Sequence, residues 1–325
     1  MKPDLSQISK PIEIELNQFN QLFKESLKSK VGIVDLITKY ILKQKGKKIR
    51  PLLVIHSSKV VGKVNERTYR GATLVELLHT ATLIHDDVVD GAEKRRGLPS
   101  INAIWKNKIA VLMGDYMLSR GLLLSVNGKD YDFLGIISNT VKRMSEGELL
   151  QIKKTQKLDI DEETYFKIIS DKTASLLATC CEIGAASATD NENEIIAMRN
   201  YGEYLGLAFQ IRDDILDYIG TAKLVGKPLG ADIKDKKITL PLIYALRNSD
   251  KSQRSDIIKM IKNGKKKNNI DQIIKFVDKF NGIEYASKVA EEYGNKAKDS
   301  LSQFENSESK IALEALIDFV ITRKS

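Results

Sequence analysis

Cysteine and proline are both scarce in this sequence. Its 325 residues include 2 cysteines and 6 prolines. Cys180 and Cys181 are adjacent, so they form neither a C-x-x-C pair nor a disulfide framework. This excludes a disulfide-stapled secreted fold and a cysteine-based zinc site. We therefore expect a protein of the reducing cytoplasm.

Long uninterrupted apolar runs are missing as well. No such run approaches the roughly 18 residues that a membrane-spanning helix needs. The N-terminal stretch MKPDLSQISKPIEIEL mixes acidic and basic residues where a signal peptide would be apolar. The sequence therefore predicts neither a transmembrane segment nor an export signal.

The composition is that of a globular protein with a positive charge. Hydrophobic residues make up 42% and charged residues 29%, which allows a sizeable core. The 52 basic residues exceed the 43 acidic ones, giving a net charge of +9. Such a charge fits nucleic acid, an anionic membrane surface or phosphorylated small molecules, and only the placement of the charges discriminates among them.

The distribution of apolar residues predicts an all-α protein. Leu74, Leu77, Leu78, Ala81 and Ile84 recur at helical spacing, whereas period-2 alternation is scarce. We expect buried helices over 71–90 and 201–218, and loops over 91–99, 220–237 and 262–269. No linker separates two halves, so we predict a single domain over 1–325.

Two acidic clusters follow apolar helical runs. They lie in LIHDDVVD, with Asp86, Asp87 and Asp90, and in IRDDILD, with Asp213, Asp214 and Asp217. The first and last residues of each cluster are four apart and share a helix face. Carboxylate oxygens without neighbouring cysteines suit Mg²⁺, which joins carboxylates to substrate phosphates. Two facing clusters would therefore clamp a diphosphate.

Basic residues alternate with these acids along the chain. They are Lys47, Lys48, Arg50, Lys94, Arg95, Arg96, Lys172, Lys227, Lys234, Lys236 and Lys237. Acids beside cationic loops suit a polyanion that is bound partly through Mg²⁺ and partly by direct contacts. Nucleic acid favours a continuous basic face without acids. His79 lies two helical turns before Asp86 and shares its face, whereas His56 and His85 have no metal-ligand spacing.

Together these motifs resemble the trans-isoprenyl diphosphate synthase, or polyprenyl synthetase, family. The resemblance runs from GKKIRP to the C-terminus, and its two aspartate-rich motifs match those of the family in order and spacing. The segments LLHTATLIHDDVVD and GLAFQIRDDILDY are most similar to octaprenyl and related long-chain synthases. Two features depart from the family: Lys45-Gly46 replaces a Gly-Gly pair, and the loop at Lys227 is longer than in short-chain members.

The resemblance implies a role for each matching residue. The diphosphate of isopentenyl diphosphate is then held by Lys47, Arg50, His79 and Arg96. Mg²⁺ on the allylic diphosphate is ligated by Asp86, Asp90 and Asp213, with Asp87, Asp214 and Asp217 completing the motifs. Direct contacts to that diphosphate come from Arg95, Lys172, Lys227 and Lys237. Thr173 and Gln210 flank the reacting carbons.

The resemblance also implies the fold and the reaction. The fold is a bundle of long helices around a central cavity, the isoprenoid synthase fold, and family members form homodimers. Positive charge allows the allylic C–O bond to ionise in a site shielded from water. Isopentenyl diphosphate then attacks the carbocation, and loss of a proton gives a chain five carbons longer. No side-chain nucleophile is needed.

Small residues next to the first cluster predict a long product. Ala81 and Thr82 lie about one turn, roughly 5–6 Å, before Asp86 on the same helix. Short-chain members of the family carry aromatic rings there, so small residues leave room for a growing tail. We expect a hexaprenyl to octaprenyl product for quinone side chains, with the floor of the tunnel formed by residues between Phe133 and Met144.

Other functions remain open at this stage. They are a shorter-chain geranylgeranyl synthase, a class I terpene cyclase, and a non-catalytic prenyl-binding partner subunit. A cyclase has no need of the second diphosphate site, and a subunit without chemistry has no need of intact acidic and basic motifs. A nucleic-acid-binding role for the positive charge is tested by retention on DNA at physiological salt.

Overall fold

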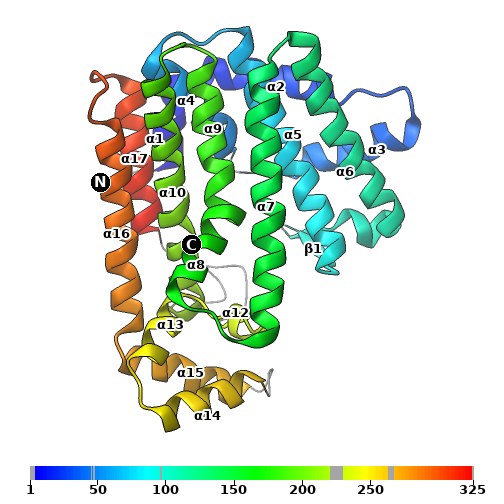
Figure 1. Ribbon diagram of the computed structural model, residues 1–325. Helices are drawn as coiled ribbons and strands as arrows, with labels where there is room; N and C mark the ends of the chain where they lie inside the picture. Colours follow the sequence, from blue (N-terminus) through cyan, green and yellow to red (C-terminus); the bar gives the residue numbers. More distant parts are fainter. Residues whose placement is uncertain are drawn as a thin grey trace.

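The computed structural model describes residues 4–44, 46, 48–95, 97–219, 230–262 and 267–323. These residues fold almost entirely into helices, which confirms the all-α prediction (Figure 1). The helices of the first half are α1 (Leu5–Ser9), η1 (Lys10–Ile12), α2 (Glu13–Ser26), α3 (Gly32–Lys43), α4 (Ile49–Val61), α5 (Glu66–Val89), α6 (Ile101–Gly128) and α7 (Tyr131–Lys157). Those that follow are α8 (Glu162–Ile169), η2 (Ser170–Ala174), α9 (Ser175–Ala186), α10 (Glu192–Ile219), α12 (Ala231–Lys234), α13 (Leu240–Arg247), α14 (Lys251–Lys262), α15 (Lys267–Lys279), α16 (Gly282–Leu301) and α17 (Glu308–Thr322).

The predicted loops contain small elements that the sequence did not reveal. Residues 91–99 include the short antiparallel strands β1 (Lys94–Arg95) and β2 (Leu98–Pro99). Ala231–Lys234 form α12 inside the predicted loop 220–237. Each piece is too short to give a periodic pattern, so its conformation depends on contacts made in the fold.

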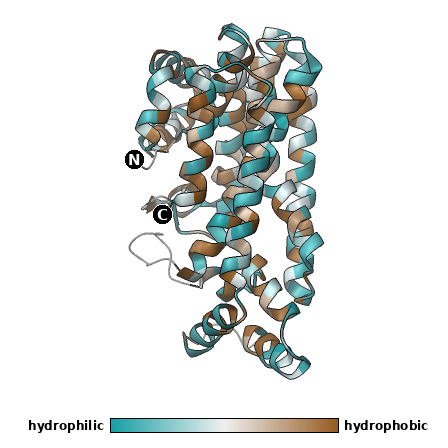
Figure 2. Ribbon diagram, turned by 90° about the vertical axis from the view of Figure 1, so that its left-hand side faces the viewer, coloured by the Kyte–Doolittle hydropathy of each residue, from teal (hydrophilic) through white to brown (hydrophobic). Residues whose placement is uncertain are grey.

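The long helices run side by side and enclose three apolar clusters (Figure 1). The largest lies between α4, α5, α9, α10 and α17, and another joins α10 to α13, α15 and α16. The third lies between α5 and α6, with α3 beside it. At the lower end, α14 and α15 extend beyond the main bundle, and teal and brown segments alternate along them (Figure 2). Such amphipathic helices bury only one face.

Helix α5 occupies the centre of this arrangement. Asn65 caps its first turn by accepting from the Arg67 and Thr68 amides, and the Thr68 hydroxyl accepts from the Asn65 amide. This reciprocal capping box fixes the start of the helix. Leu74 and Leu78 face the largest cluster, whereas Leu77 and Ala81 face α6. Apolar packing on two sides holds α5 in place and thereby positions the acids at its C-terminal end.

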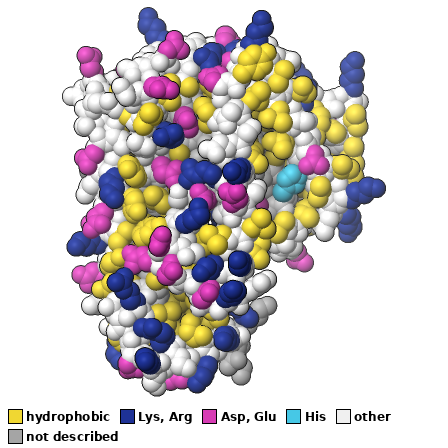
Figure 3. Space-filling model, viewed as in Figure 1, with side chains coloured by type: hydrophobic (Ala, Val, Ile, Leu, Met, Phe, Trp, Pro, Cys, Tyr) yellow, Lys and Arg dark blue, Asp and Glu magenta, His cyan; other side chains and the backbone are white. Residues whose placement is uncertain are grey.

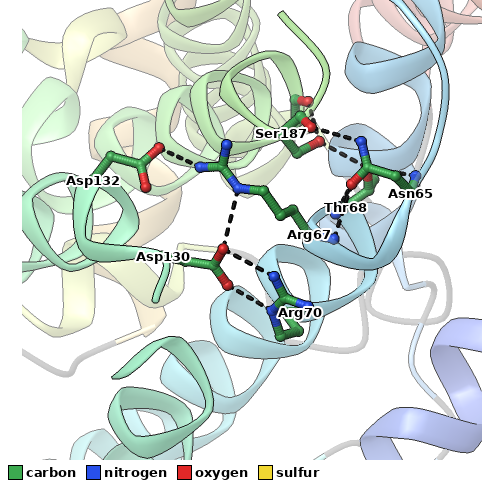
Figure 4. Close-up of polar contacts among 8 residues, drawn as sticks. Asn65, Arg67, Thr68, Arg70, Asp130, Asp132 and Ser187 are labelled. Atoms are coloured by element: carbon green, nitrogen blue, oxygen red, sulfur yellow. Dashed lines mark hydrogen bonds and ion pairs between the residues drawn. The ribbon is translucent and has the colours of Figure 1, made fainter. Parts of the chain in front are cut away.

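Ion pairs fix the N-terminal end of α5. Arg67 and Arg70 both bind the buried Asp130 in the α6–α7 turn, with Nε–Oδ distances of 3.1 and 2.6 Å (Figure 4). Arg67 also binds Asp132 at 2.6 Å. Its guanidinium lies 4.8 Å from the centre of the Phe133 ring. Phe133 is therefore held between charged groups and the apolar interior.

One helix does not meet the expectation that no segment could span a membrane. By length and composition, α6 is apolar enough to do so. The sequence gives no uninterrupted apolar run here, because Asp115 and Arg120 lie among the apolar residues of α6. In the structure α6 packs along α5, and about a third of its apolar window is buried.

Buried His56 makes the stability of the fold depend on pH. Its Nε2–H donates to the Ile8 carbonyl at 2.9 Å, and its Nδ1 lies 3.1 Å from the Ser309 hydroxyl. Burial lowers the pKa of His56 to about 4, although the bond to Ile8 opposes this shift. Because the unfolded state takes up this proton near pH 6.5, stability is lost as the pH falls from about 6.5 towards 4.

The expected loss is about 2 kcal/mol between pH 7 and pH 4.5. Urea unfolding of the wild type and of His56→Gln at both pH values isolates the contribution of His56 to the unfolding free energy, since other groups titrate equally in both proteins. The difference in unfolding free energy between the two proteins should shrink by this amount at the lower pH. Parallel pH profiles would contradict the assignment.

Candidate active site

The two acidic clusters lie at the C-terminal ends of long helices, as predicted. Asp86 and Asp87 are in the last turn of α5 and Asp90 follows it, while Asp213, Asp214 and Asp217 lie near the end of α10. Among the residues that the structure describes, no three acidic, histidine or cysteine side chains converge into a ready-made metal site. The six carboxylates of the two motifs are not equivalent, because several already have protein partners.

In the first cluster, Asp87 forms an ion pair, whereas Asp86 and Asp90 are accessible to solvent. Asp87 is buried and binds Arg95 of β1 at 2.6 and 2.7 Å. Asp86 is accessible to solvent on one side and surrounded by protein on the other. This partial burial raises the pKa of Asp86, and the nearby Lys172 opposes the shift. Asp90 is exposed.

In the second cluster, Asp214 and Asp217 hold the structure together. The Asp217 carboxylate accepts from the Ala231 and Asp232 amides at 3.0 and 3.1 Å, which caps α12. Asp214 accepts from the Tyr165 hydroxyl at 2.7 Å and the Gln210 amide at 2.8 Å. Burial, reinforced by the Asp232 carboxylate, raises the pKa of Asp214 to about 8.

The remaining acid of this cluster, Asp213, binds the end of the chain. Its Oδ1 lies 2.5 Å from Arg323 Nη2, and the guanidinium stacks 4.0 Å from the centre of the Phe209 ring. Arg212 fixes the Arg323 carbonyl through two donors at 3.1 and 2.8 Å. The Arg323 side chain is only 8% exposed, so a cation is held firmly against Asp213.

Asp86 and Asp90 are accessible and can receive a metal ion, whereas Asp213 can do so only when it is released from Arg323. Asp86 and Asp90 are one helical turn apart, and their oxygens are ligands of the kind that hard divalent cations prefer. A cation already occupies the position beside Asp213 in the form of Arg323. These carboxylate donors thus fit a hard divalent cation such as Mg²⁺ better than Zn²⁺, which favours sulfur and nitrogen.

A cavity of about 110 Å³ lies next to the second cluster. Lys172, Thr173, Gln210, Asp214 and Lys237 are among its lining residues. Lys172 lies 2.5 Å from Glu148 and 2.9 Å from Gln151. The Thr173 hydroxyl donates to Gln210 at 2.9 Å, so the structure brings this predicted pair together.

A second cavity, of about 130 Å³, lies on the other side of α5. His79, Arg95 and Lys48 line it, and α2 adds Asn20 and Lys24. Partial burial lowers the pKa of Lys48; Glu76 opposes this shift, and Lys24 adds to it. Asp86 is influenced by Lys172, which lines the first cavity, and by Arg95, which lines the second. A basic residue of each cavity therefore lies near enough to Asp86 to act on its charge.

Other predicted site residues fall in different places. Arg50 is half-buried in the first turn of α4. Ala81 is buried between α5 and α6, packed with Met113 and Met117, and Thr82 is half-buried with its hydroxyl on the His79 carbonyl at 2.9 Å. Lys47, Arg96 and Lys227 lie outside the described residues.

Several lining residues were not singled out from the sequence. Asn20 and Lys24 lie far along the chain from any acidic motif, so no local pattern could connect them to the second cavity. Gln151, which lines the first cavity, and Glu148, which binds Lys172, are three apart in GELLQ. That spacing puts both on one helix face and was a usable signal. Arg323 meets Asp213 only through the fold.

Comparison with known proteins gives a consistent result. The sequence model of the polyprenyl synthetase family matches residues 32–277. The octaprenyl diphosphate synthase of Haemophilus influenzae is 33% identical, covering 98% of this chain and 97% of its own length. The short chain isoprenyl diphosphate synthase of Methanothermobacter thermautotrophicus is 32% identical, covering 95% and 98%. The crystal structure of a polyprenyl synthase from Caulobacter crescentus, complexed with calcium and isoprenyl diphosphate, superimposes with a TM-score of 0.92 at 31% identity, covering 100% and 99%.

Proposed function

The chain belongs to the polyprenyl synthetase family, and from this premise we propose that its two cavities hold the two substrates of a long-chain trans-prenyl diphosphate synthase. The all-α isoprenoid synthase fold and prenyltransferase activity come with the family. One observation carries the proposal: each cavity is lined by basic residues and by one aspartate of a motif, Asp214 in the first and Asp87 in the second.

We assign the first cavity to the allylic diphosphate. Lys172 and Lys237 line it, and we add Arg95 by resemblance, although it lines the second cavity and binds Asp87. We include Lys227 as a further contact to this diphosphate because of the sequence motif alone. Asp86, Asp90 and Asp213 would hold divalent metal ions, here Mg²⁺, which would supply positive charge to the departing diphosphate. Asp87, Asp214 and Asp217 support them by fixing β1, Gln210 and α12.

We assign the second cavity to isopentenyl diphosphate. His79 lies on the same face of α5 as Asp86, which orients the substrate towards the allylic carbon. Lys48 and Lys24, to which the resemblance assigned no role, add positive charge to this cavity. Arg50, Lys47 and Arg96 complete the set by resemblance. Charged groups in a fixed arrangement favour ionisation because they need not reorganise during the reaction.

Thr173 and Gln210 lie where the reacting carbons meet. Their mutual hydrogen bond orients the Thr173 oxygen and the Gln210 amide, and Gln210 is held in turn by Asp214. We propose that they stabilise positive charge on the allylic cation through their oxygen dipoles. The apolar residues behind them exclude water, which would otherwise capture that cation.

We propose a long-chain product from the place of a bulky residue behind α5. Gly71 lies fifteen residues before Asp86, about 22 Å along α5. A methyl group there would approach the fully buried Phe133 ring to 3.2 Å, so Phe133 packs directly on the helix backbone. We propose Phe133 as the floor, which leaves several helical turns for a hexaprenyl to octaprenyl chain that serves as a quinone side chain. A geranylgeranyl product is the alternative, since relatives include a short-chain synthase.

The assembly and location complete the proposal. α6 exposes Ile104, Val111, Leu112, Leu123 and Val126, and helical spacing puts the last four on one face. Hydrophobic side chains are prominent over α6 and α7 in Figure 3. We propose that this face joins a second copy in a homodimer, because a folded chain seldom leaves so many apolar residues on one helix face. We also propose a cytoplasmic protein with a single domain over 1–325; both cysteines are buried and unbridged.

Arg323 should compete with the metal ion at Asp213. Replacing it by glutamine removes the bound cation, so we expect Mn²⁺ to bind about 3–10-fold more tightly in a calorimetric titration. Lys298→Gln is the control, since it breaks an exposed ion pair to Asp318 between α16 and α17. Equal or weaker metal binding by Arg323→Gln would show that the pair does not oppose metal entry.

Diphosphate release tests the proposed reaction directly. The purified protein should release diphosphate only when farnesyl diphosphate and isopentenyl diphosphate are both present with Mg²⁺. Release from farnesyl diphosphate alone would instead indicate cyclase or hydrolase chemistry.

A further inference from the structure

The segment that carries Lys172 and Thr173 is a π-helical turn. Residues Ser170–Ala174 form η2, and the Ser175 amide closes it by donating to the Ser170 carbonyl, five residues earlier. A π turn holds one residue more than an α turn and is a less stable arrangement, so it persists only where the surroundings maintain it. Two glycines make room for it. A methyl at Gly206 would lie 2.5 Å from the Ala174 Cα, and one at Gly147 would lie 2.9 Å from the Asp171 Cβ.

Behind this turn, on the side away from the first cavity, lies a polar groove of about 500 Å³. Arg143 of α7 lines it together with Ser175, Glu182, Arg199 and Glu203. In Figure 3, acidic and basic side chains gather at the centre of the face that shows α7 and α10. None of the residues assigned above to substrate or metal lines this groove.

Arg143 connects three elements at the base of the groove. Its Nε binds Asp171 at 2.9 Å, and its Nη2 binds the Ser170 hydroxyl at 2.8 Å and Glu203 of α10 at 2.9 Å. The Ser170 hydroxyl also donates to Glu203. Lys167 binds the other Asp171 oxygen at 3.0 Å. One guanidinium thus fixes both residues that begin the π turn and ties them to α7 and α10.

The opposite side of the turn faces the site. Lys172 points to Gln151 and Glu148, and Thr173 points to Gln210. If the turn relaxed to α-helical geometry, the register would slip by one residue. Such a slip turns the side chains by about 100° and carries Lys172 and Thr173 out of their positions.

We propose that Arg143, anchored by Glu203, is a positioning residue for the reaction: it holds the π turn in register so that Lys172 and Thr173 face the allylic diphosphate. This inference rests on the proposed function for the role of those two side chains, but the clamp itself is a property of the fold. Arg143 touches no substrate, and its effect reaches the site only through the backbone of η2.

Arg143→Met keeps the length of the side chain and removes its donors. We expect kcat to fall about 10–100-fold, because small displacements of positioned groups have effects of this size. The KM for isopentenyl diphosphate should change less than about twofold, since the second cavity is untouched. Arg143→Lys should recover part of the loss. Arg199→Met is the matched control, because Arg199 lines the same groove. Among the described residues, Arg199 makes no hydrogen bond to the π turn.

Hydrogen exchange tests the clamp without relying on activity. In Arg143→Met, the amides of 170–175 should exchange at least about tenfold faster, while those of α7 and α10 away from the clamp stay unchanged. Faster exchange with no turnover even in the wild type would support the clamp and refute the proposed function. Unchanged exchange at 170–175, or kinetics equal to those of Arg199→Met, would overturn the inference. Uniformly faster exchange would also overturn it, since Arg143 would then be a general stabiliser.

Discussion

Replacing Asp86 by asparagine is expected to lower kcat by roughly 10²–10³-fold. Lys172 of the first cavity and Arg95 of the second both act on the charge of Asp86, so its carboxylate lies near the groups that we assign to the departing diphosphate. Asparagine keeps the shape and one oxygen but loses the negative charge that holds a divalent cation. Initial rates with both substrates, together with calorimetric Mn²⁺ titration, measure the two consequences separately.

The same change should not weaken the fold. Partial burial raises the pKa of Asp86, which means that its charged form is disfavoured in the folded protein. Removing the charge should therefore leave the melting temperature equal or higher. Asp35→Asn serves as the control, because Asp35 forms an exposed pair with Lys39 on α3. An Asp86→Asn protein with undiminished turnover would remove Asp86 from the site.

A phenylalanine at Ala81 is expected to shorten the product by several isoprene units. Ala81 is buried one turn below the first acidic cluster, where it packs with Met113 and Met117 of α6. A ring at this position cannot fit beside the methionines without moving α6 or projecting into the path of the growing chain. Thr82→Phe should act in the same direction. Chromatography of dephosphorylated products shows the change as a ladder that ends earlier.

The floor gives the complementary test. Phe133→Leu removes the ring that packs on Gly71, and the ladder should extend beyond that of the wild type. Thr82→Val is the matched control, since it preserves the volume and should leave the ladder unchanged. Ladders of equal length for Ala81→Phe, Thr82→Phe and wild type would show that the tail follows another path.

Local patterns predicted a large part of this molecule. Helical spacing of apolar residues located α5 and α10, and the absence of proline between Pro99 and Pro228 allowed α7 to exceed seven turns. The acidic clusters were placed correctly at helix ends because each follows directly on its apolar run. Thr173 and Gln210 were linked by resemblance, and their hydrogen bond supports that link.

What the sequence could not predict depends on distant contacts. Asp213, Asp214 and Asp217 look equivalent in IRDDILD, yet their partners are Arg323, Tyr165 with Gln210, and the amides of α12. No periodicity distinguishes three acids within one helical turn and a half. The π turn at Ser170–Ala174 could not be predicted either, because the space for its extra residue is provided by Gly147 and Gly206 on other helices.

The central claim is that this chain elongates an allylic diphosphate with isopentenyl diphosphate to a long all-trans chain. The most direct measurement is incubation with Mg²⁺, labelled isopentenyl diphosphate and farnesyl diphosphate, followed by separation of the dephosphorylated products by length. We predict a ladder that ends between hexaprenyl and octaprenyl. A ladder that stops at geranylgeranyl would contradict the long-chain assignment, and a cyclic hydrocarbon or no turnover with either farnesyl or geranylgeranyl diphosphate would contradict the synthase itself.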